Sequence, residues 1–217
     1  MSDRDLMALT MSAENRWMQH WVAGPTIEGS PLRRGSTAPE VELLGPDGSK
    51  VMLSTTWAES PALVLLWRHL GCGCGRERAM RLRTELDDFH AAGLNVAVVA
   101  PGDPERVEAY ALRNALTVTV LADPGYDAHR AFGLGHWSVE QVLYDAPEEY
   151  CDLDAGIGAE FQAKRRAEGN NLVDDPWMQS GEFVVDPEGM IRVAYLYNYC
   201  EDYPDPRVFL TAARLAG

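Results

Sequence analysis

Cysteines stand at positions 72 and 74, within the glycine-rich stretch 68–77. This stretch follows the apolar run 62–67, and a pattern of helical period continues from it to about residue 90. A buried strand is therefore predicted to lead into a turn that opens a helix. Backbone N–H groups at a helix start stabilise anions, so they lower the pKa of a thiol and make its sulfur a nucleophile.

Two sulfurs so close together suit thiol-dependent redox chemistry. One thiolate would attack a peroxide oxygen or a disulfide sulfur, and the other would resolve the sulfenic acid or mixed disulfide. Gly73 permits the sharp bend of a bond across three residues, and we expect such a strained pair to be oxidising. Nearby arginines would stabilise the thiolate, and His69 is either a base or proton shuttle or a satisfied histidine. The candidate catalytic residues are Cys72, Cys74, Arg68, His69 and Arg76.

Two other readings stay open. A Cys-Gly-Cys pair can bind a soft ion such as Cu(I) or Zn(II), with His69, His129 or His136 as a third ligand. Metal signatures usually hold two spaced pairs, however, and only one is present here. Alternatively, the chain is a binding module, or an enzyme specialised for a small sulfur-containing or oxidisable metabolite.

Composition narrows the class of protein. The 217 residues carry 33 acidic and 19 basic side chains, a formal charge of −14, which argues against nucleic acid or an anionic membrane as partner. No apolar run reaches the roughly 20 residues that a membrane helix needs. The start lacks a basic-then-apolar leader, so we expect a cytoplasmic protein whose cysteines are catalytic. No P-loop, His-Glu-x-x-His or Gly-x-Ser-x-Gly motif is present, and we expect no cofactor.

The N-terminal 34 residues are predicted to be a helix over 4–22 followed by a linker. Met7, Met11, Met18 and Trp21 share one face of this helix, and Trp17 and Trp21 form an i,i+4 pair. The helix would pack on its own domain or serve as a dimerisation arm, which makes a homodimer possible.

Residues 35–217 are predicted to form one α/β domain. Strands at 62–67, 94–100 and 118–121 alternate with helices, which implies right-handed crossovers and a parallel core. Hairpins are expected at 38–53 and 182–197, and a terminal helix at 207–215. The helical pattern is broken over 136–178, which we interpret as an insertion with helices near 138–149 and 158–168.

Four stretches in this order resemble the peroxiredoxin-like form of the thioredoxin fold, in the alkyl hydroperoxide reductase / thiol-specific antioxidant superfamily. They are 35–41 (Gly-x-x-Ala-Pro), 67–77 (Arg-x-x-Gly-Cys…Arg-Glu), 121–134 (Leu-x-Asp-Pro…Phe-Gly-Leu) and 180–189 (x-Gly-x-Phe-Val-x-Asp-x-x-Gly). The resemblance implies a mixed central sheet flanked by helices. It also implies a thiol reductant, either thioredoxin-like or of low molecular weight, and a peroxide, disulfide or small-molecule substrate.

The chain departs from that family at the cysteines. Where Cys-x-x-Cys is usual, Cys72 keeps the first position and Cys74 is displaced by one, so we assign Cys72 as nucleophile and Cys74 as resolver, with the reverse order open. Peroxiredoxins place a threonine three residues before the peroxidatic cysteine, and His69 or Gly71 stands there instead. They also place an arginine before the last hairpin, where this chain has Gln179. We therefore predict a strained redox pair rather than a generic peroxidase centre. Cys200 is expected to lie away from it, near the sheet edge.

Overall fold

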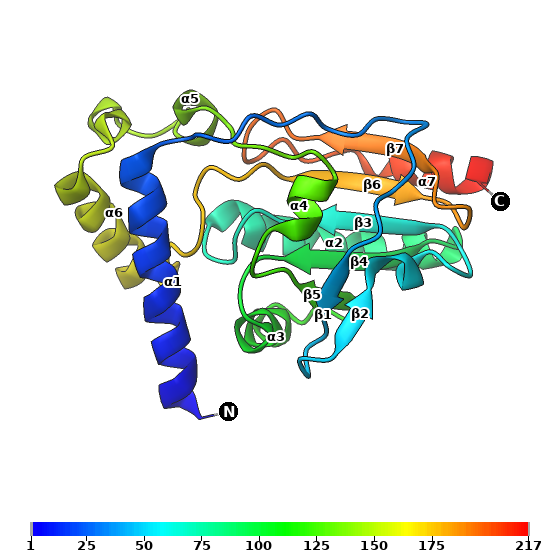
Figure 1. Cartoon of the computed structure of the whole chain (residues 1–217), viewed down its shortest axis with the longest axis horizontal. Helices are drawn as coiled ribbons and strands as arrows, with labels where there is room; N and C mark the ends of the chain where they lie inside the picture. The colour runs from blue at the N-terminus through cyan, green and yellow to red at the C-terminus, as the bar shows by residue number, and fades with distance from the viewer. Residues whose placement is uncertain (1, 217) are drawn as a thin grey trace.

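Three parallel strands form the centre of the sheet. The computed structural model describes residues 2–216, and in it β3 (Ala62–Leu66) pairs with β4 (Asn95–Ala100), which pairs with β5 (Thr119–Ala122). Every residue of β3 is buried, as expected for a strand covered on both faces. The crossovers between these strands are α2 (Gly73–Ala91) and α3 (Pro104–Arg113) (Figure 1).

Antiparallel strands extend the sheet on both sides. β1 (Glu42–Leu44) and β2 (Lys50–Met52) form a hairpin beside β5, and β6 (Gly181–Val185) and β7 (Ile191–Leu196) form another beside β3. The strand order is therefore β2-β1-β5-β4-β3-β6-β7. The predicted fold class, a mixed central sheet flanked by helices, is confirmed.

Helices cover both faces of this sheet. On one face α2, α3 and α7 (Pro206–Ala216) pack against alternate residues of β3 and β4, with Phe89 and Phe209 edge to face. On the other face the core contains residues of α4 (Asp127–Ala131) and of the 3-10 turn η1 (Leu53–Thr56). This alternation matches the period-2 pleat of a β-strand. The cysteine turn lies between the end of β3 and the start of α2.

A third apolar cluster lies outside the sheet. α1 (Asp3–Ala23) runs beside α6 (Ala155–Ala167) at one end of the molecule (Figure 1). Trp17 and Trp21 of α1 stack at 4.9 Å between ring centroids, and Trp21 stacks on Trp177 at 5.5 Å. The helical insertion thus packs on the N-terminal helix through aromatic side chains.

Two details of these helices differ from the sequence prediction. Met7 and Met11 are 64% and 58% exposed, because α1 packs through Ala13, Trp17, Trp21 and the partly buried Met18. The predicted helix 138–149 is only α5 (Val139–Val142), followed by the 3-10 turn η2 (Glu148–Asp152). Pro147 explains the interruption, because the residue before a proline is disfavoured in helical conformation.

Within residues 2–216 no helix has the length and apolarity that a membrane crossing requires.

Candidate active site

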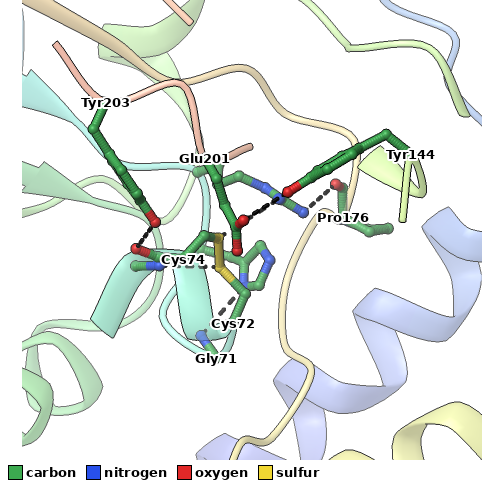
Figure 2. The surroundings of a disulfide bond; sticks show 10 residues. Gly71, Cys72, Cys74, Tyr144, Pro176, Glu201 and Tyr203 are labelled. Atoms are coloured by element: carbon green, nitrogen blue, oxygen red, sulfur yellow. Dashed lines mark hydrogen bonds between the residues drawn. A yellow bond between two sulfur atoms is a disulfide. The ribbon is translucent and has the colours of Figure 1, made fainter. Parts of the chain in front are cut away.

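The two cysteines lie at the N-terminus of α2. Cys72 is the N-cap residue, and its Sγ accepts the backbone N–H of Gly75 at 3.2 Å. Cys74 lies within the first turn and is buried, whereas Cys72 is partly exposed. A disulfide joins them, with 5.3 Å between the Cα atoms (Figure 2). In the reduced state this position favours a thiolate at Cys72, because the helix N-terminus carries partial positive charge.

Arg68 brings a buried positive charge to the second sulfur. Its Nη1 lies 3.9 Å from Cys74 Sγ, and its Nη2 donates to the carbonyl of Pro176 at 2.7 Å. Its Nε has no hydrogen-bond partner, and no carboxylate among residues 2–216 pairs with this guanidinium. The guanidinium also lies 5.4 Å from the ring centroid of Trp137. A cation held there without a counter-ion stabilises an anion beside it, such as the Cys74 thiolate.

His69 is buried beside the turn and is held neutral. Its Nδ1 accepts the N–H of Gly71 at 3.2 Å, so the neutral ring carries its proton on Nε2. Burial, and then the positive charges of Arg68, Arg106 and Arg165, hold the pKa of His69 well below its ordinary 6.5. In this geometry His69 can donate a hydrogen bond from Nε2, and its role as a base or proton shuttle stays a prediction.

Residues 170–176, here called the strap, pack directly on the cysteine turn. A Cβ added to Gly71 would meet the carbonyl oxygen of Asn171 at 1.5 Å, so only glycine fits there. Arg76, exposed on the first turn of α2, donates to the side-chain oxygen of Asn170. Asp174 accepts two hydrogen bonds from Arg106 of α3, at 2.9 and 2.6 Å. The strap therefore contacts the cysteine turn and is hydrogen-bonded to α3, one of the helices that cover the sheet.

Tyr126 joins the far end of the strap to the segment before the cysteines. Its hydroxyl accepts the N–H of Asp175 at 3.0 Å and donates to the carbonyl of Arg68 at 3.2 Å. Asp175 in turn bonds Nε2 of His136 at 2.9 Å. Burial and the neighbouring aspartates raise the pKa of Tyr126 well above its ordinary value, so its hydroxyl keeps the proton for this bridge.

A cavity of about 450 Å³, here called the aromatic cavity, lies against both sulfurs. The strand-side wall holds Arg68, His69, Cys72 and Cys74, and the opposite wall comes from α1 and the insertion. That second wall holds four aromatic side chains, several aliphatic ones and charges of both signs. The aromatic side chains are Trp17, Trp21, Tyr150 and Phe161, and the charged ones are Lys164, Arg165, Asp145 and Glu168. Its size falls within the range of small-molecule sites.

Cys200 also lines the aromatic cavity, which corrects the expectation that it lies away from the pair. The chain turns back after β7, because Asp202 accepts the N–H of Asn198 at 2.9 Å and the hydroxyl of Tyr195 at 2.9 Å. The next tyrosine, Tyr203, donates to the carbonyl of Cys74 at 2.9 Å (Figure 2). Burial raises the pKa of the Cys200 thiol, and the charge of Arg68 partly offsets this.

Two of the three histidines considered as metal ligands, His129 and His136, are engaged elsewhere. His129 contacts Asp123 and the carbonyl of Trp67, and Nδ1 of His136 accepts backbone N–H groups while its Nε2 bonds Asp175. In the part of the chain that the structure describes, no three His, Cys, Asp or Glu side chains gather as a metal site. The soft-metal alternative therefore gains no third ligand from these residues.

Sequence reasoning did not find the residues that enclose the sulfurs. Tyr203, Tyr110, the strap and the wall formed by α6 reach the turn only through the tertiary fold. The Trp17–Trp21 pair was visible in the sequence, but its contribution to a site was not.

The fold and the site together define a thiol-dependent protein of the thioredoxin fold. A family model described as the AhpC/TSA family matches residues 34–194. The chain belongs to this family, and the predictions of a peroxiredoxin-like member and of a thiol peroxidase or oxidoreductase enzyme are confirmed.

Relatives support the same assignment. The chain is 25% identical to the thioredoxin-like protein AAED1, chloroplastic, of Arabidopsis thaliana over 77% of this chain and 67% of that protein. It is 27% identical to peroxiredoxin Bcp of Escherichia coli over 54% of this chain and 74% of that protein. Peroxidoxin BcpB from Mycobacterium tuberculosis has a similar fold, with a TM-score of 0.60 at 12% identity, covering 86% of this chain and 99% of that one.

Proposed function

We propose that Cys72 and Cys74 cycle between dithiol and disulfide, and that a small oxidising molecule bound in the aromatic cavity is the substrate. The observation that carries this proposal is the cavity itself, which lies between the cysteine turn and the wall of α1 and the insertion. A partly open cavity of this size beside the sulfurs favours a small molecule over a protein disulfide. The peroxiredoxin names of several relatives support a hydroperoxide as the oxidant.

The proposed reaction begins at Cys72, because it is the more exposed sulfur and caps the helix. Its thiolate attacks one peroxide oxygen, the O–O bond breaks, and the alkoxide leaves as an alcohol after taking a proton. Cys72 is then a sulfenic acid. The Cys74 thiolate, stabilised by Arg68, attacks Cys72 Sγ and displaces hydroxide, which leaves as water.

A thiol reductant restores the dithiol. Arg68 and His69 line the aromatic cavity beside the cysteines, which supports a role for both in this site, whereas Arg76 lines a second cavity described below. A cytoplasmic location and a homodimer stay predictions.

Thiol counting with Cys→Ser variants tests the cycle. One equivalent of cumene hydroperoxide should remove two alkylatable thiols from the wild type. Cys72→Ser should lose turnover, and Cys74→Ser should accumulate a sulfenic acid at Cys72 that dimedone traps. Cys151→Ser, at an exposed position, is the matched control and should behave as wild type. Full activity of Cys72→Ser would overturn the proposal.

The role of the cavity is tested separately by Phe161→Ala. Loss of one aromatic wall should raise KM for cumene hydroperoxide about fivefold, the effect of roughly 1 kcal/mol of aromatic contact, and leave KM for hydrogen peroxide unchanged. Leu112→Ala removes an exposed side chain of α3 and serves as control. Equal effects on both peroxides would argue against substrate binding in this cavity.

A further inference from the structure

A second cavity, of about 330 Å³, reaches the disulfide from other elements. It is lined by the start of α2, by α3, by the strap and by the N-terminal half of α1. Cys72 is the single residue that lines both this cavity and the aromatic cavity among those described. The Cys72 sulfur is therefore the point at which the two spaces meet.

This second cavity is positively charged in a strongly acidic protein. Arg76, Arg106 and Arg113 line it, and no aspartate or glutamate is among the described lining residues. Arg106 is neutralised by Asp174, at 2.6 Å. Within residues 2–216, neither Arg76 nor Arg113 forms an ion pair, so two positive charges face this space without compensation. We call it the cationic cavity.

Tyr110 lines the cationic cavity and carries a buried, unsatisfied hydroxyl. The residue is 7% exposed, and its hydroxyl has no hydrogen-bond partner. A Cβ built on Gly75 would lie 3.4 Å from this hydroxyl and 3.9 Å from Cys72 Sγ, so the hydroxyl and the sulfur flank one point. Burial raises the pKa of Tyr110 to about 12, which keeps it a donor at neutral pH. A buried donor without a partner is costly, and a ligand oxygen would satisfy it.

We propose that the cationic cavity binds an acidic low-molecular-weight thiol, whose carboxylates contact Arg76 and Arg113 and whose sulfur attacks Cys72 beside the Tyr110 hydroxyl. This inference rests on the proposed function, because it supplies the reducing half of the same cycle. It also gives each cavity one role: the oxidant reaches Cys72 from the aromatic cavity and the reductant from the cationic cavity.

The chemistry balances with two thiols. The first thiolate attacks Cys72 Sγ, the Cys72–Cys74 bond breaks, and Cys74 leaves as a thiolate next to Arg68. A second thiolate attacks the ligand sulfur of the mixed disulfide and releases Cys72 as a thiolate. The two thiols are oxidised to one disulfide, and the protein disulfide is reduced by two electrons.

The test compares glutathione with glutathione diethyl ester, which has the same thiol and masked carboxylates. Oxidised full-length protein is mixed anaerobically with each thiol at low salt, quenched by alkylation, and its free thiols are counted by mass spectrometry. Wild type should be reduced roughly fivefold faster by glutathione, the effect expected of partly screened ion pairs. Arg113→Gln should lose most of this preference, because it removes a charge that a carboxylate contacts. Tyr110→Phe should slow reduction by both thiols, because its hydroxyl lies beside the attacking sulfur. Arg83→Gln removes an exposed charge of α2 outside both cavities and should retain it.

Dithiothreitol separates the possible failures. It is uncharged and should reduce wild type, Arg113→Gln and Arg83→Gln at similar rates, which shows that the charge variants are folded. Equal rates with glutathione and its ester in wild type would overturn this inference, as would an unchanged preference in Arg113→Gln. If cumene hydroperoxide cannot re-form the Cys72–Cys74 disulfide after dithiothreitol treatment, the proposed function itself is wrong.

Discussion

The ion pair between Arg106 and Asp174 should control the stability of the strap. Their side chains are 5% and 4% exposed, and two hydrogen bonds join them. Asp174→Asn is the informative change, because the backbone φ of 62° at this position is one that asparagine tolerates. It removes the charge and keeps the shape, which leaves the buried Arg106 guanidinium with only the more distant carboxylate of Asp103, at 4.0 Å.

The expected loss follows from the burial of the pair. Removing one partner of a buried ion pair costs about 3–5 kcal/mol, and we expect about 3 kcal/mol because the asparagine oxygen still accepts a hydrogen bond. For a chain of this size, about 3 kcal/mol corresponds to a fall in Tm of roughly 6–12 °C. Urea unfolding followed by far-UV circular dichroism gives the free energy of unfolding, and calorimetry gives Tm.

Two comparisons make this measurement decisive. Asp205→Asn breaks an exposed pair with Arg207 and should change neither Tm nor the urea midpoint. The double variant Arg106→Met/Asp174→Asn removes the Arg106 charge as well. It should lose less free energy of unfolding than the two single variants lose together. A loss below about 1 kcal/mol for Asp174→Asn, or strict additivity in the double variant, would refute the reasoning.

Three further predictions concern the turn. Gly71→Ala should lower the free energy of unfolding by about 3 kcal/mol and slow disulfide cycling, because its Cβ would collide with the backbone oxygen of Asn171. Thermal unfolding and thiol counting check this prediction, and a wild-type Tm would contradict it. Because the pKa of His69 is lowered in the folded protein, the unfolded chain takes up a proton near pH 6.5 and the folded chain does not. The free energy of unfolding therefore decreases as the pH falls below about 6.5, by up to about 1.4 kcal/mol per pH unit. His69→Asn, which keeps an acceptor for the Gly71 N–H, should show a shallower fall in urea titrations between pH 7 and 5, and parallel curves would exclude the effect. Arg68→Met should make the reduction potential of the Cys72–Cys74 pair more negative, by about 30 mV for each 1.4 kcal/mol of thiolate stabilisation that is lost. The potential is measured by equilibration with a glutathione redox buffer. An unchanged potential would show that the guanidinium does not act on Cys74.

The cysteine turn and the strands around it could be predicted because their signals are local. An apolar run before a glycine-rich stretch and a helical period after it predict β3, the turn and α2 without any long-range information. The arginine next to Cys74 was also found in this way, since Arg68 is close in sequence.

The enclosure of the turn could not be predicted, because it depends on residues about 50 to 130 positions away from the cysteines in the chain. Nothing in the pattern around Phe161 or Tyr203 indicates that either approaches the disulfide region, and Cys200 was expected elsewhere. The break after α5 is different, because its signal is local. The predicted helix over 138–149 ran across Pro147, which disfavours helical conformation in the residue before it.

The stacked tryptophans have a practical consequence. Trp17 and Trp21 line the same cavity as the disulfide, and Trp21 stacks on Trp177. Disulfides quench the excited state of a nearby indole, whereas thiols do so less. The protein therefore carries its own optical reporter, and its intrinsic emission should brighten when the Cys72–Cys74 bond opens. Both halves of the catalytic cycle could be followed in real time without any label.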